Sequence, residues 1–594
     1  MAEFSLRERC AINEASLRRF RAGVGGVRLA PLARFGPARH KPRRMATLPA
    51  PIPEFANRVL RRPRLAALVL GALAATGFQP LALWPVTLAA LVALLALIAR
   101  ADNAKRAALL GWLFGVGHFS VGNTWIATAF TYQAAMPAAM GWVAVFGLAL
   151  YLAVYPLLAA LAAWLIAGRA GRITWPLVLA FAGSWAIAEW LRSWVFSGYV
   201  WNPLGVVALG GFARPGLASV LPWLGTYALS AVVIVFAGGW WIAARALSRS
   251  GTAAMQALRV GGLSAAAVMV WMIGPDFGPR DAPTALAFTL VQPDTRQQDL
   301  DDPAKYDAQF VTTAALTEPG VTHARRLVLW PESGIPDLLR GGYPGYFYAE
   351  STYGADPALA RGRIARVIGK GSLLLTGAVD LVLHGDRVVG ARNVVTALGD
   401  DAAIRASYAK AHLVPGGEYL PLRSLLAPLG LTRLVAGALD FLPGPGPRTL
   451  DFGRVSAGGY GRAGIQICYE IIFSGQVVDR ANRPDYIFNP SNDGWFGASG
   501  PPQHLAQARL RAIEEGLPVL RATTTGVSAV VDADGVVRQT IPRLQAGRIE
   551  GFVPPAHPPT LFARLGNILP LGWAIVLIAA ALLHSKIALR PRRG

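Results

Sequence analysis

Ile465-Gln466-Ile467-Cys468-Tyr469-Glu470 is a short apolar run that ends in a cysteine, followed by a tyrosine and a glutamate. A side chain at the end of a predicted strand can project into a site while the strand holds its backbone. Because the thiolate of a cysteine is a strong nucleophile, Cys468 is a candidate for nucleophilic catalysis. The alternative is a small buried core residue, which is the usual role of a lone cysteine in an apolar run.

Two further segments supply groups that a reactive thiol needs. Glu332 follows the strand-like run Leu329-Trp330-Pro331 into a turn, where it could act as a general base. Lys410 could stabilise an oxyanion, and Glu418 is a second carboxylate that could orient this lysine. The segments lie far apart in the sequence, which leaves their proximity open. Glu332 could instead cap a turn, and Lys410 could lie on the surface.

The block of sequence that carries these residues is expected to form one α/β domain, because short β-rich apolar runs alternate there with helical segments. The predicted strands are Leu286–Val291, Leu327–Trp330, Ser372–Val379, Gly464–Cys468, Tyr486–Asn489 and Ser528–Asp532. The predicted helices are Pro303–Leu316, Asp356–Ile368 and Gln503–Glu515.

The rest of the chain has the composition of a membrane protein. Of the 594 residues of the whole chain, 53% are hydrophobic and 15% are charged, whereas soluble domains carry about 25% charged residues. Eight apolar runs are predicted to cross a hydrocarbon core of about 30 Å. They are Leu65–Phe78, Leu81–Ile98, Ala107–Phe130, Ala138–Ala167, Ile173–Val195, Leu217–Ala244, Val260–Gly274 and Ile568–His584.

The basic residues predict how these spans are oriented. The formal net charge is +23, and the basic clusters beside the spans all fall on one side of the membrane if both termini are cytoplasmic. The α/β block then faces away from the cytoplasm. This distribution argues against binding of nucleic acid. Four segments are predicted: a disordered basic tail (1–60), seven transmembrane helices (61–281), the α/β domain (282–558), and the eighth helix with a basic tail (559–594).

The cysteines and histidines limit other classes of protein. Only Cys10 and Cys468 are present, so a disulfide-stabilised secreted domain is excluded. His412 and His504 lack the spacing of metal ligands, and we expect neither a metal nor another cofactor. Met45 is a candidate for the true start of the protein.

Glu332, Lys410 and Cys468, in this order and in these contexts, resemble the Glu-Lys-Cys triad of the nitrilase, or carbon–nitrogen hydrolase, superfamily. Together with the eight predicted spans, further motifs resemble the apolipoprotein N-acyltransferase family over about Arg61 to the C-terminus. These motifs are Leu413–Pro421, Ile467–Glu470, Asn489–Gly497, Gln503-His504, Arg509 and Arg521–Thr523. Relatives often carry Gln-x-x-Lys-Trp where this chain reads Arg296-Gln297-Gln298-Asp299-Leu300, so a lipid-contacting tryptophan is missing here.

The resemblance implies an αββα sandwich outside the inner membrane of a bacterium. It implies that Cys468 takes an acyl chain from a phospholipid, phosphatidylethanolamine, as a thioester. The α-amino group of a diacylglyceryl-cysteine apolipoprotein would then accept the chain, in the last step of lipoprotein maturation. Glu332 would be the base, Lys410 the oxyanion stabiliser, and Glu418 a supporting carboxylate.

Four aromatic residues and two neighbours of the cysteine complete the predicted site. The resemblance gives Tyr469 a part in shaping the oxyanion site and Glu470 a part in orienting it. Trp495 and Phe496 are candidates for substrate binding, as are two aromatic residues of the segment 341–354, Tyr346 and Phe347, which could also form an ordinary aromatic cluster.

The residues by themselves are also compatible with two other functions. Water can resolve a thioester as an amine can, so a membrane-anchored amidase of nitrilase type that hydrolyses a small amide is the alternative enzyme. A transporter or scaffold is the alternative outside the enzymes. The scarcity of charged residues inside the predicted spans argues against an ion-coupled carrier.

Overall fold

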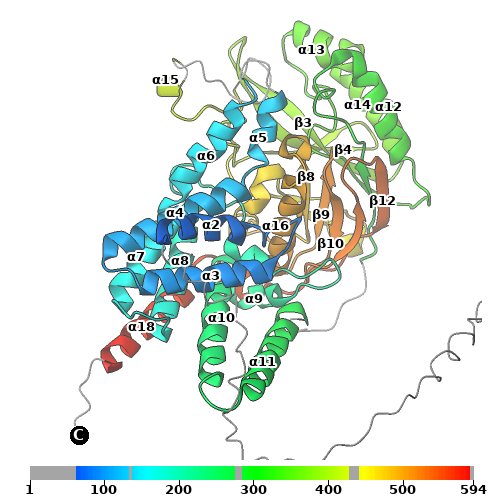
Figure 1. Cartoon of the computed structure of the whole chain (residues 1–594). Helices are drawn as coiled ribbons and strands as arrows, with labels where there is room; N and C mark the ends of the chain where they lie inside the picture. The colour runs from blue at the N-terminus through cyan, green and yellow to red at the C-terminus, as the bar shows by residue number, and fades with distance from the viewer. Residues whose placement is uncertain (1–61, 133–136, 274–283, 427, 429–439, 589–594) are drawn as a thin grey trace, which may run out of the picture. The chain divides into compact units, whose positions relative to one another are not determined.

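The computed structural model describes residues 62–132, 137–273, 284–426, 428 and 440–588 (Figure 1). The predicted disordered tail 1–60 and the candidate start Met45 lie outside the described residues. All of the described residues belong to one compact unit of the chain, Ala56–Gly594.

Apolar helices make up the first half of the described chain and its C-terminal end. α2, α3 and α8 each have a proline in the first turn. Proline is favourable there because the N–H groups of the first turn make no hydrogen bond within the helix, so the N–H that proline lacks is not needed. The helices are α2 (Pro63–Ala75), α3 (Trp84–Ala99), α4 (Ala104–Gly122), α5 (Ile126–Ala129), α6 (Met140–Leu152), α7 (Val154–Ala167), α8 (Trp175–Arg192), α9 (Leu221–Leu224), α10 (Thr226–Leu247), α11 (Ala253–Ile273) and α18 (Ile568–Ala588).

Small residues let α2 and α4 pack with their backbones in close approach. A Cβ at Gly71 would lie 1.9 Å from the carbonyl oxygen of Phe114, and one at Gly117 would lie 2.0 Å from that of Leu68. Glycine is therefore required at both positions, as at the close helix–helix contacts of membrane proteins.

Four helical stretches among the described residues are long and apolar enough to cross a membrane: Met140–Ala167, Thr226–Leu247, Ala253–Met272 and Ile568–Ser585. The first contains α6 and α7, which together occupy the fourth predicted span. The apolar helices α2 and α3 are shorter, α4 begins with Lys105 and Arg106, and α8 ends near Glu189 and Arg192. A membrane part is therefore supported, and the count of eight spans stays a prediction.

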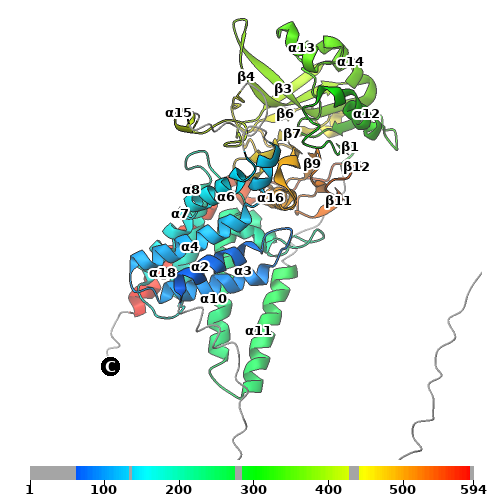
Figure 2. The same cartoon turned by 45° about the horizontal axis from the view of Figure 1, so that its top comes forward.

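Two six-stranded sheets form the α/β part (Figure 2). Their orders are β12-β1-β2-β3-β4-β5 and β11-β10-β9-β8-β7-β6, with β1, β2 and β3 parallel in one and β7, β8 and β9 parallel in the other. The strands are β1 (Ala287–Gln292), β2 (Arg326–Leu329), β3 (Ser372–His384), β4 (Arg387–Gly399), β5 (Ile404–Ala409), β6 (Thr449–Asp451), β7 (Arg462–Ile465), β8 (Tyr486–Ser491), β9 (Val519–Thr523), β10 (Ser528–Val531), β11 (Val537–Ile541) and β12 (Gly547–Phe552).

The sheets contact each other through three pairs of strands, β1 with β9, β12 with β11, and β5 with β6, and helices contact both sheets. Helices α12 (Tyr306–Thr317) and α14 (Pro357–Ile368) contact the first sheet, and α16 (Gly500–Glu515) contacts the second. The predicted α/β domain is confirmed. Every residue of β1, β2, β8, β9 and β10 is buried, which explains why these strands show no regular alternation of polar and apolar residues.

Candidate active site

The candidate catalytic residues follow the ends of three strands. Glu332 comes three residues after β2, Lys410 directly after β5, and Cys468 three residues after β7. β2 and β5 belong to the first sheet and β7 to the second, so the site forms where strand ends of two contacting sheets come together. In α/β folds, ligand sites lie beyond the carboxyl ends of the strands. The fold thus explains why segments far apart in sequence come together.

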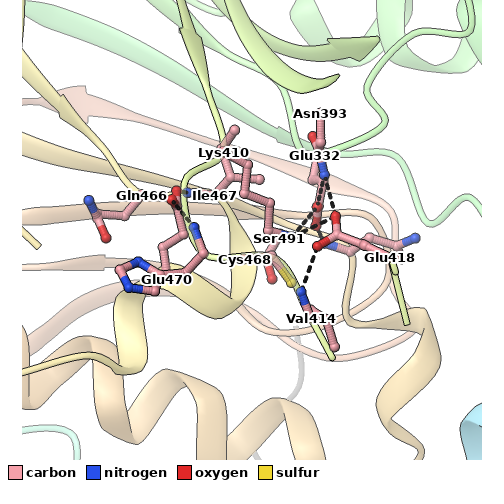
Figure 3. A network of polar contacts seen from close by, with 12 residues as sticks. Glu332, Asn393, Lys410, Val414, Glu418, Gln466, Ile467, Cys468, Glu470 and Ser491 are labelled. Carbon is pink, nitrogen blue, oxygen red and sulfur yellow. Dashed lines mark hydrogen bonds and ion pairs between the residues drawn. The ribbon is translucent and has the colours of Figure 1, made fainter. Parts of the chain in front are cut away.

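Lys410 lies between two carboxylates (Figure 3). Its Nζ is 3.3 Å from Oε1 of Glu332 and 3.0 Å from Oε1 of Glu418. The exposed fractions of Lys410, Glu332, Glu418 and Cys468 are 2%, 6%, 5% and 4%, so water screens these charges weakly. Glu418 is therefore within reach of Lys410, and its role in orienting this lysine stays a prediction.

Neutral donors hold both carboxylates in place. Asn393 Nδ2 donates to Oε1 of Glu332 at 2.7 Å and to Oε1 of Glu418 at 3.1 Å. The backbone N–H of Asn492 donates to the second oxygen of Glu332 at 2.7 Å, and that of Val414 to the second oxygen of Glu418 at 2.8 Å. Each carboxylate is therefore fixed through both of its oxygens.

Cys468 is the first residue of the 3-10 helix η9 (Cys468–Ile472) rather than the last residue of a strand. The predicted strand Gly464–Cys468 is too long at its end, since β7 stops at Ile465. Cys468 has a φ of +49°, a left-handed backbone that costs a residue other than glycine roughly 1–2 kcal/mol. This conformation turns the chain sharply at the thiol.

Glu470 ties the cysteine segment to the lysine segment. It accepts hydrogen bonds from the backbone N–H groups of Ile467 and Ala411, each at 2.7 Å, and from the hydroxyl of Tyr408 at 2.8 Å. Burial raises the pKa of Glu470 to about 7, against these hydrogen bonds, which lower it. These hydrogen bonds join the segments that carry Cys468 and Lys410, and the orienting role of Glu470 at the oxyanion site stays a prediction.

The charges around the thiol favour a protonated cysteine beside a charged lysine. Burial, and then the negative charge of Glu332, raise the pKa of Cys468 well above its usual value, while Lys410 opposes this shift. Burial alone would lower the pKa of Lys410, but Glu332 and Glu418 raise it above its usual value. A base is therefore needed to generate the thiolate, and a fixed cation is already present.

The other predicted residues lie in different surroundings. The Tyr469 hydroxyl donates to the carbonyl oxygen of Gly198 at 3.3 Å, so its side chain faces the helical part of the chain. The ring of Trp495 lies 6.0 Å from that of Tyr132, and Phe496 is buried among aromatic residues of the helical part.

Tyr346 and Phe347 lie on α13 (Gly345–Ser351), where their ring centroids are 4.4 Å apart. In Figures 1 and 2 this helix lies beside α14 and away from α16. The structure does not bring these two residues to the triad, and their role in substrate binding stays a prediction.

Three residues that hold the site received no role from the sequence. Asn393 lies inside β4, and an asparagine within a β-rich run is unusual enough to have served as a signal. Asn492 lay in a motif but received no role. Gln297 accepts from Asn492 Nδ2 at 2.9 Å, so the segment that lacks the family's tryptophan contributes a polar contact instead.

One group of side chains has the composition of a metal site. Cys468 Sγ, an Asp493 carboxylate oxygen and a His504 ring nitrogen lie within 4.8 Å of one another. Both nitrogens of His504 and both oxygens of Asp493 already have protein partners. An ion would have to displace these hydrogen bonds, and the proposed thiol chemistry does not require one.

Two protein families match this chain, one over the helical part and one over the α/β part. Residues 299–549 match the carbon–nitrogen hydrolase family, which agrees with two sheets that place a glutamate, a lysine and a cysteine together. Residues 70–239 match the N-terminal domain of apolipoprotein N-acyltransferase. The chain belongs to the apolipoprotein N-acyltransferase family.

The full-length relatives agree with this assignment. The apolipoprotein N-acyltransferase of Rhodopseudomonas palustris is 33% identical over 541 residues, which cover 88% of this chain and 95% of that protein. The one of Bradyrhizobium diazoefficiens is 34% identical over 545 residues, which cover 89% and 95%. Among solved structures, an amidase from Nesterenkonia sp. AN1 is 18% identical with a TM-score of 0.31, covering 50% of this chain and 96% of that chain.

Proposed function

We propose that this protein transfers an acyl chain from a phospholipid to the N-terminal α-amino group of a diacylglyceryl-cysteine apolipoprotein, through a thioester on Cys468. The observation that carries the proposal is the buried Lys410 between Glu332 and Glu418, electrostatically coupled to the Cys468 thiol. A fixed cation beside a nucleophile and a base is what acyl transfer through a tetrahedral oxyanion requires.

In the first half-reaction, Glu332 accepts the thiol proton and Sγ attacks the ester carbonyl carbon of the donor. Lys410 stabilises the oxyanion of the tetrahedral intermediate. As the intermediate collapses, the C–O bond breaks, Glu332 returns the proton to the leaving alkoxide, and a lysophospholipid departs. Phosphatidylethanolamine is the proposed donor.

In the second half-reaction, the neutral α-amino group of the acceptor attacks the thioester carbonyl. Glu332 accepts a proton from the attacking nitrogen, and Lys410 again stabilises the oxyanion. The C–S bond breaks, the amide departs, and the proton on Glu332 returns to the Cys468 thiolate. This ping-pong sequence divides one acyl transfer into two steps that share a single base.

Supporting residues act through the three that react. Glu418 fixes Lys410, and Glu470 fixes the segments of Cys468 and Lys410 relative to each other. The backbone next to Tyr469 is proposed to shape the oxyanion site. Trp495, which is partly exposed, is proposed to contact lipid, whereas Phe496 acts by packing.

The proposed setting is the bacterial inner membrane. The segments 61–281 and 559–594 would supply eight spans with both termini in the cytoplasm, and the segment 282–558 would carry out catalysis in the periplasm. This orientation agrees with the placement of the basic clusters in the sequence.

The test is intact-mass spectrometry of the purified full-length protein after incubation with phosphatidylethanolamine. We expect a mass gain of one acyl chain that is absent in Cys468→Ala and present in Cys10→Ala, the matched control at the other cysteine. A diacylglyceryl peptide with a free amino terminus should discharge the adduct and appear as its amide. Discharge by water at the same rate would instead indicate the membrane-anchored amidase.

A further inference from the structure

A second buried polar network lies behind the nucleophile and is separate from the carboxylates that hold Lys410. We call it the Arg521 network, and it consists of Arg521, Asp493, His504 and Asn489. These residues come from β9, the 3-10 helix η10 (Asp493–Phe496), α16 and β8, and all are almost fully buried. The proposed acyl transfer gives none of them a task, although burying so many polar groups is costly unless each is paired.

One branch of the network ends on the cysteine itself. His504 Nε2 lies 3.0 Å from the backbone carbonyl oxygen of Cys468. A carbonyl only accepts, so Nε2 carries the hydrogen and donates it. The other nitrogen of His504 lies 3.0 Å from Asp493 Oδ1 and 3.0 Å from Arg521 Nη2. Arg521 also pairs with the second oxygen of Asp493 at 2.6 Å.

The other branch ends two residues earlier in the chain. Arg521 Nη1 donates to Oδ1 of Asn489. Asn489 Nδ2 in turn donates to the backbone carbonyl oxygen of Gln466 at 2.6 Å. A single guanidinium therefore connects to the carbonyl groups on both sides of Ile467. The planar fork of arginine suits this, because it offers several donors in fixed directions.

These contacts fall where the backbone is strained. Cys468 holds a φ of +49°, and a strained residue of this kind persists only when its surroundings over-determine it. The direction of the Cys468 carbonyl follows the ψ angle of Cys468. A hydrogen bond from a rigid ring to that carbonyl therefore restrains the rotation that would carry Sγ away from Glu332 and Lys410.

The helical part of the chain supports His504 from its other face. The ring of Trp201, in the loop between α8 and α9, lies 5.2 Å from the His504 ring. Trp201 Nε1 donates to Gln503 Oε1 at 2.8 Å, and Gln503 Nε2 donates to the carbonyl oxygen of Gln79 at 3.0 Å. His504 thus lies between the cysteine segment and Trp201, and the neighbouring Gln503 bonds to Trp201 and to the loop of Gln79.

We propose that His504, held by Asp493 and Arg521 and packed against Trp201, is a positioning residue for Cys468. By bonding to the Cys468 carbonyl it keeps the left-handed backbone that presents the thiol to Glu332 and Lys410. The membrane part then contributes to nucleophile alignment as well as to anchoring. This inference rests on the proposed function of Cys468 as the nucleophile.

The experiment compares two substitutions at position 504 in the full-length protein. His504→Gln keeps an N–H donor at a similar reach, and His504→Leu keeps a similar volume without a donor. The matched control is His118→Leu, which removes another buried histidine that lies on α4. The readouts are the rate of thioester formation with phosphatidylethanolamine, its KM and kcat, the alkylation rate of Cys468 by iodoacetamide, and the unfolding temperature.

We expect His504→Leu to lower kcat and the alkylation rate together by about 100-fold, because a misplacement of about 1 Å has that effect on a reacting group. The KM should change less than about twofold, since no substrate contact is lost. His504→Gln should recover both rates to within about tenfold of the unaltered protein, as expected when a donor is restored. His118→Leu should leave both rates unchanged.

A purely structural role predicts a different result: a lower unfolding temperature of His504→Leu with both rates within about threefold of the unaltered protein would overturn the proposal. Equal loss in His504→Gln and His504→Leu would also overturn it. If His504→Leu does not fold, Arg521→Lys is measured in its place, because one ammonium group cannot bond to both Asn489 and His504. Unchanged rates of thioester formation and alkylation in Arg521→Lys would refute the proposal. Failure of the proposed function is a separate outcome, in which the unaltered protein forms no thioester.

Discussion

Glu332→Gln separates the two effects that Glu332 has on the Cys468 thiol. As a base, Glu332 removes the thiol proton. As a negative charge, it also raises the pKa of Cys468, second only to burial. The substitution therefore removes the proton acceptor and at the same time makes the thiol somewhat more acidic. Because burial is the larger cause and persists in the variant, we expect the loss of the base to dominate.

The magnitude follows from the contacts of Glu332. General-base catalysis contributes about 10²–10⁴ in rate, or roughly 3–6 kcal/mol at about 1.4 kcal/mol for each factor of ten. The carboxylate also accepts from Lys410, Asn393 and the backbone of Asn492. A glutamine must turn its NH₂ toward one of these donors, which costs about 1–3 kcal/mol of stability for an unsatisfied buried group.

The assay is acylation of Cys468 by phosphatidylethanolamine as a function of pH, together with alkylation by iodoacetamide. In Glu332→Gln the acylation rate at pH 7 should fall by at least 100-fold. It should then rise about tenfold for each pH unit, because hydroxide must deprotonate a thiol whose pKa stays raised. Glu318→Gln, at an exposed glutamate of the same domain, is the matched control. Rapid alkylation of Glu332→Gln at neutral pH, or more than a few per cent of residual activity, would refute Glu332 as the base.

Three further predictions test the nucleophile, a buried carboxyl and a helix contact. Cys468→Ala should abolish acyl transfer and leave the circular dichroism spectrum and unfolding temperature unchanged; retained transfer would exclude Cys468 as the nucleophile. Burial, followed by the charge of Glu514, raises the pKa of Glu515 from 4.5 to about 7. The folded protein therefore binds this proton more tightly than the unfolded chain, and stability should fall as pH rises from about 4.5 to 7. The free energy of unfolding can be measured by denaturant titration at pH 5 and pH 8. In Glu515→Gln the decrease between these two pH values should be smaller by up to about 3 kcal/mol. An unchanged decrease would contradict the raised pKa of Glu515. Gly71→Ala should destabilise the helical part by about 1–3 kcal/mol in a thermal unfolding assay, because the added Cβ would overlap the Phe114 carbonyl. Gly147→Ala, whose Cβ meets nothing within 4 Å, should be neutral or slightly stabilising in the same thermal unfolding assay.

Most residues of the strands that the sequence predicted are buried, although β9, which is buried along its whole length, was not predicted. β1, β2, β8 and β10 appear in the sequence as short, largely apolar runs, because burial on both faces disfavours polar side chains that have no partner. β11 and β12 escaped prediction since much of each strand is exposed and polar. Their place in the sheets comes from pairing, and β12 pairs with β1, which lies far away in the sequence.

The residue types of the candidate site could be predicted from local sequence, whereas their arrangement could not. Glu332, Lys410 and Cys468 were identified by the short motifs that contain them. Their meeting depends on strand ends contributed by β2, β5 and β7, and sequence spacing carries no information on that contact. Asn393 received no role because its partners, Glu332 and Glu418, become neighbours only when the sheets form.

The sequence by itself determined the apolar helices, the α/β class of the domain and the chemical groups available for thiol acyl transfer, because hydrophobic pattern and residue type are local properties. The tertiary structure decided the left-handed backbone of Cys468 and the ion pairs of Lys410. It also decided the place of His504, whose spacing had only argued against a metal ligand. Such features depend on contacts between distant segments, and the free energy of those contacts arises only when burial removes water from around them.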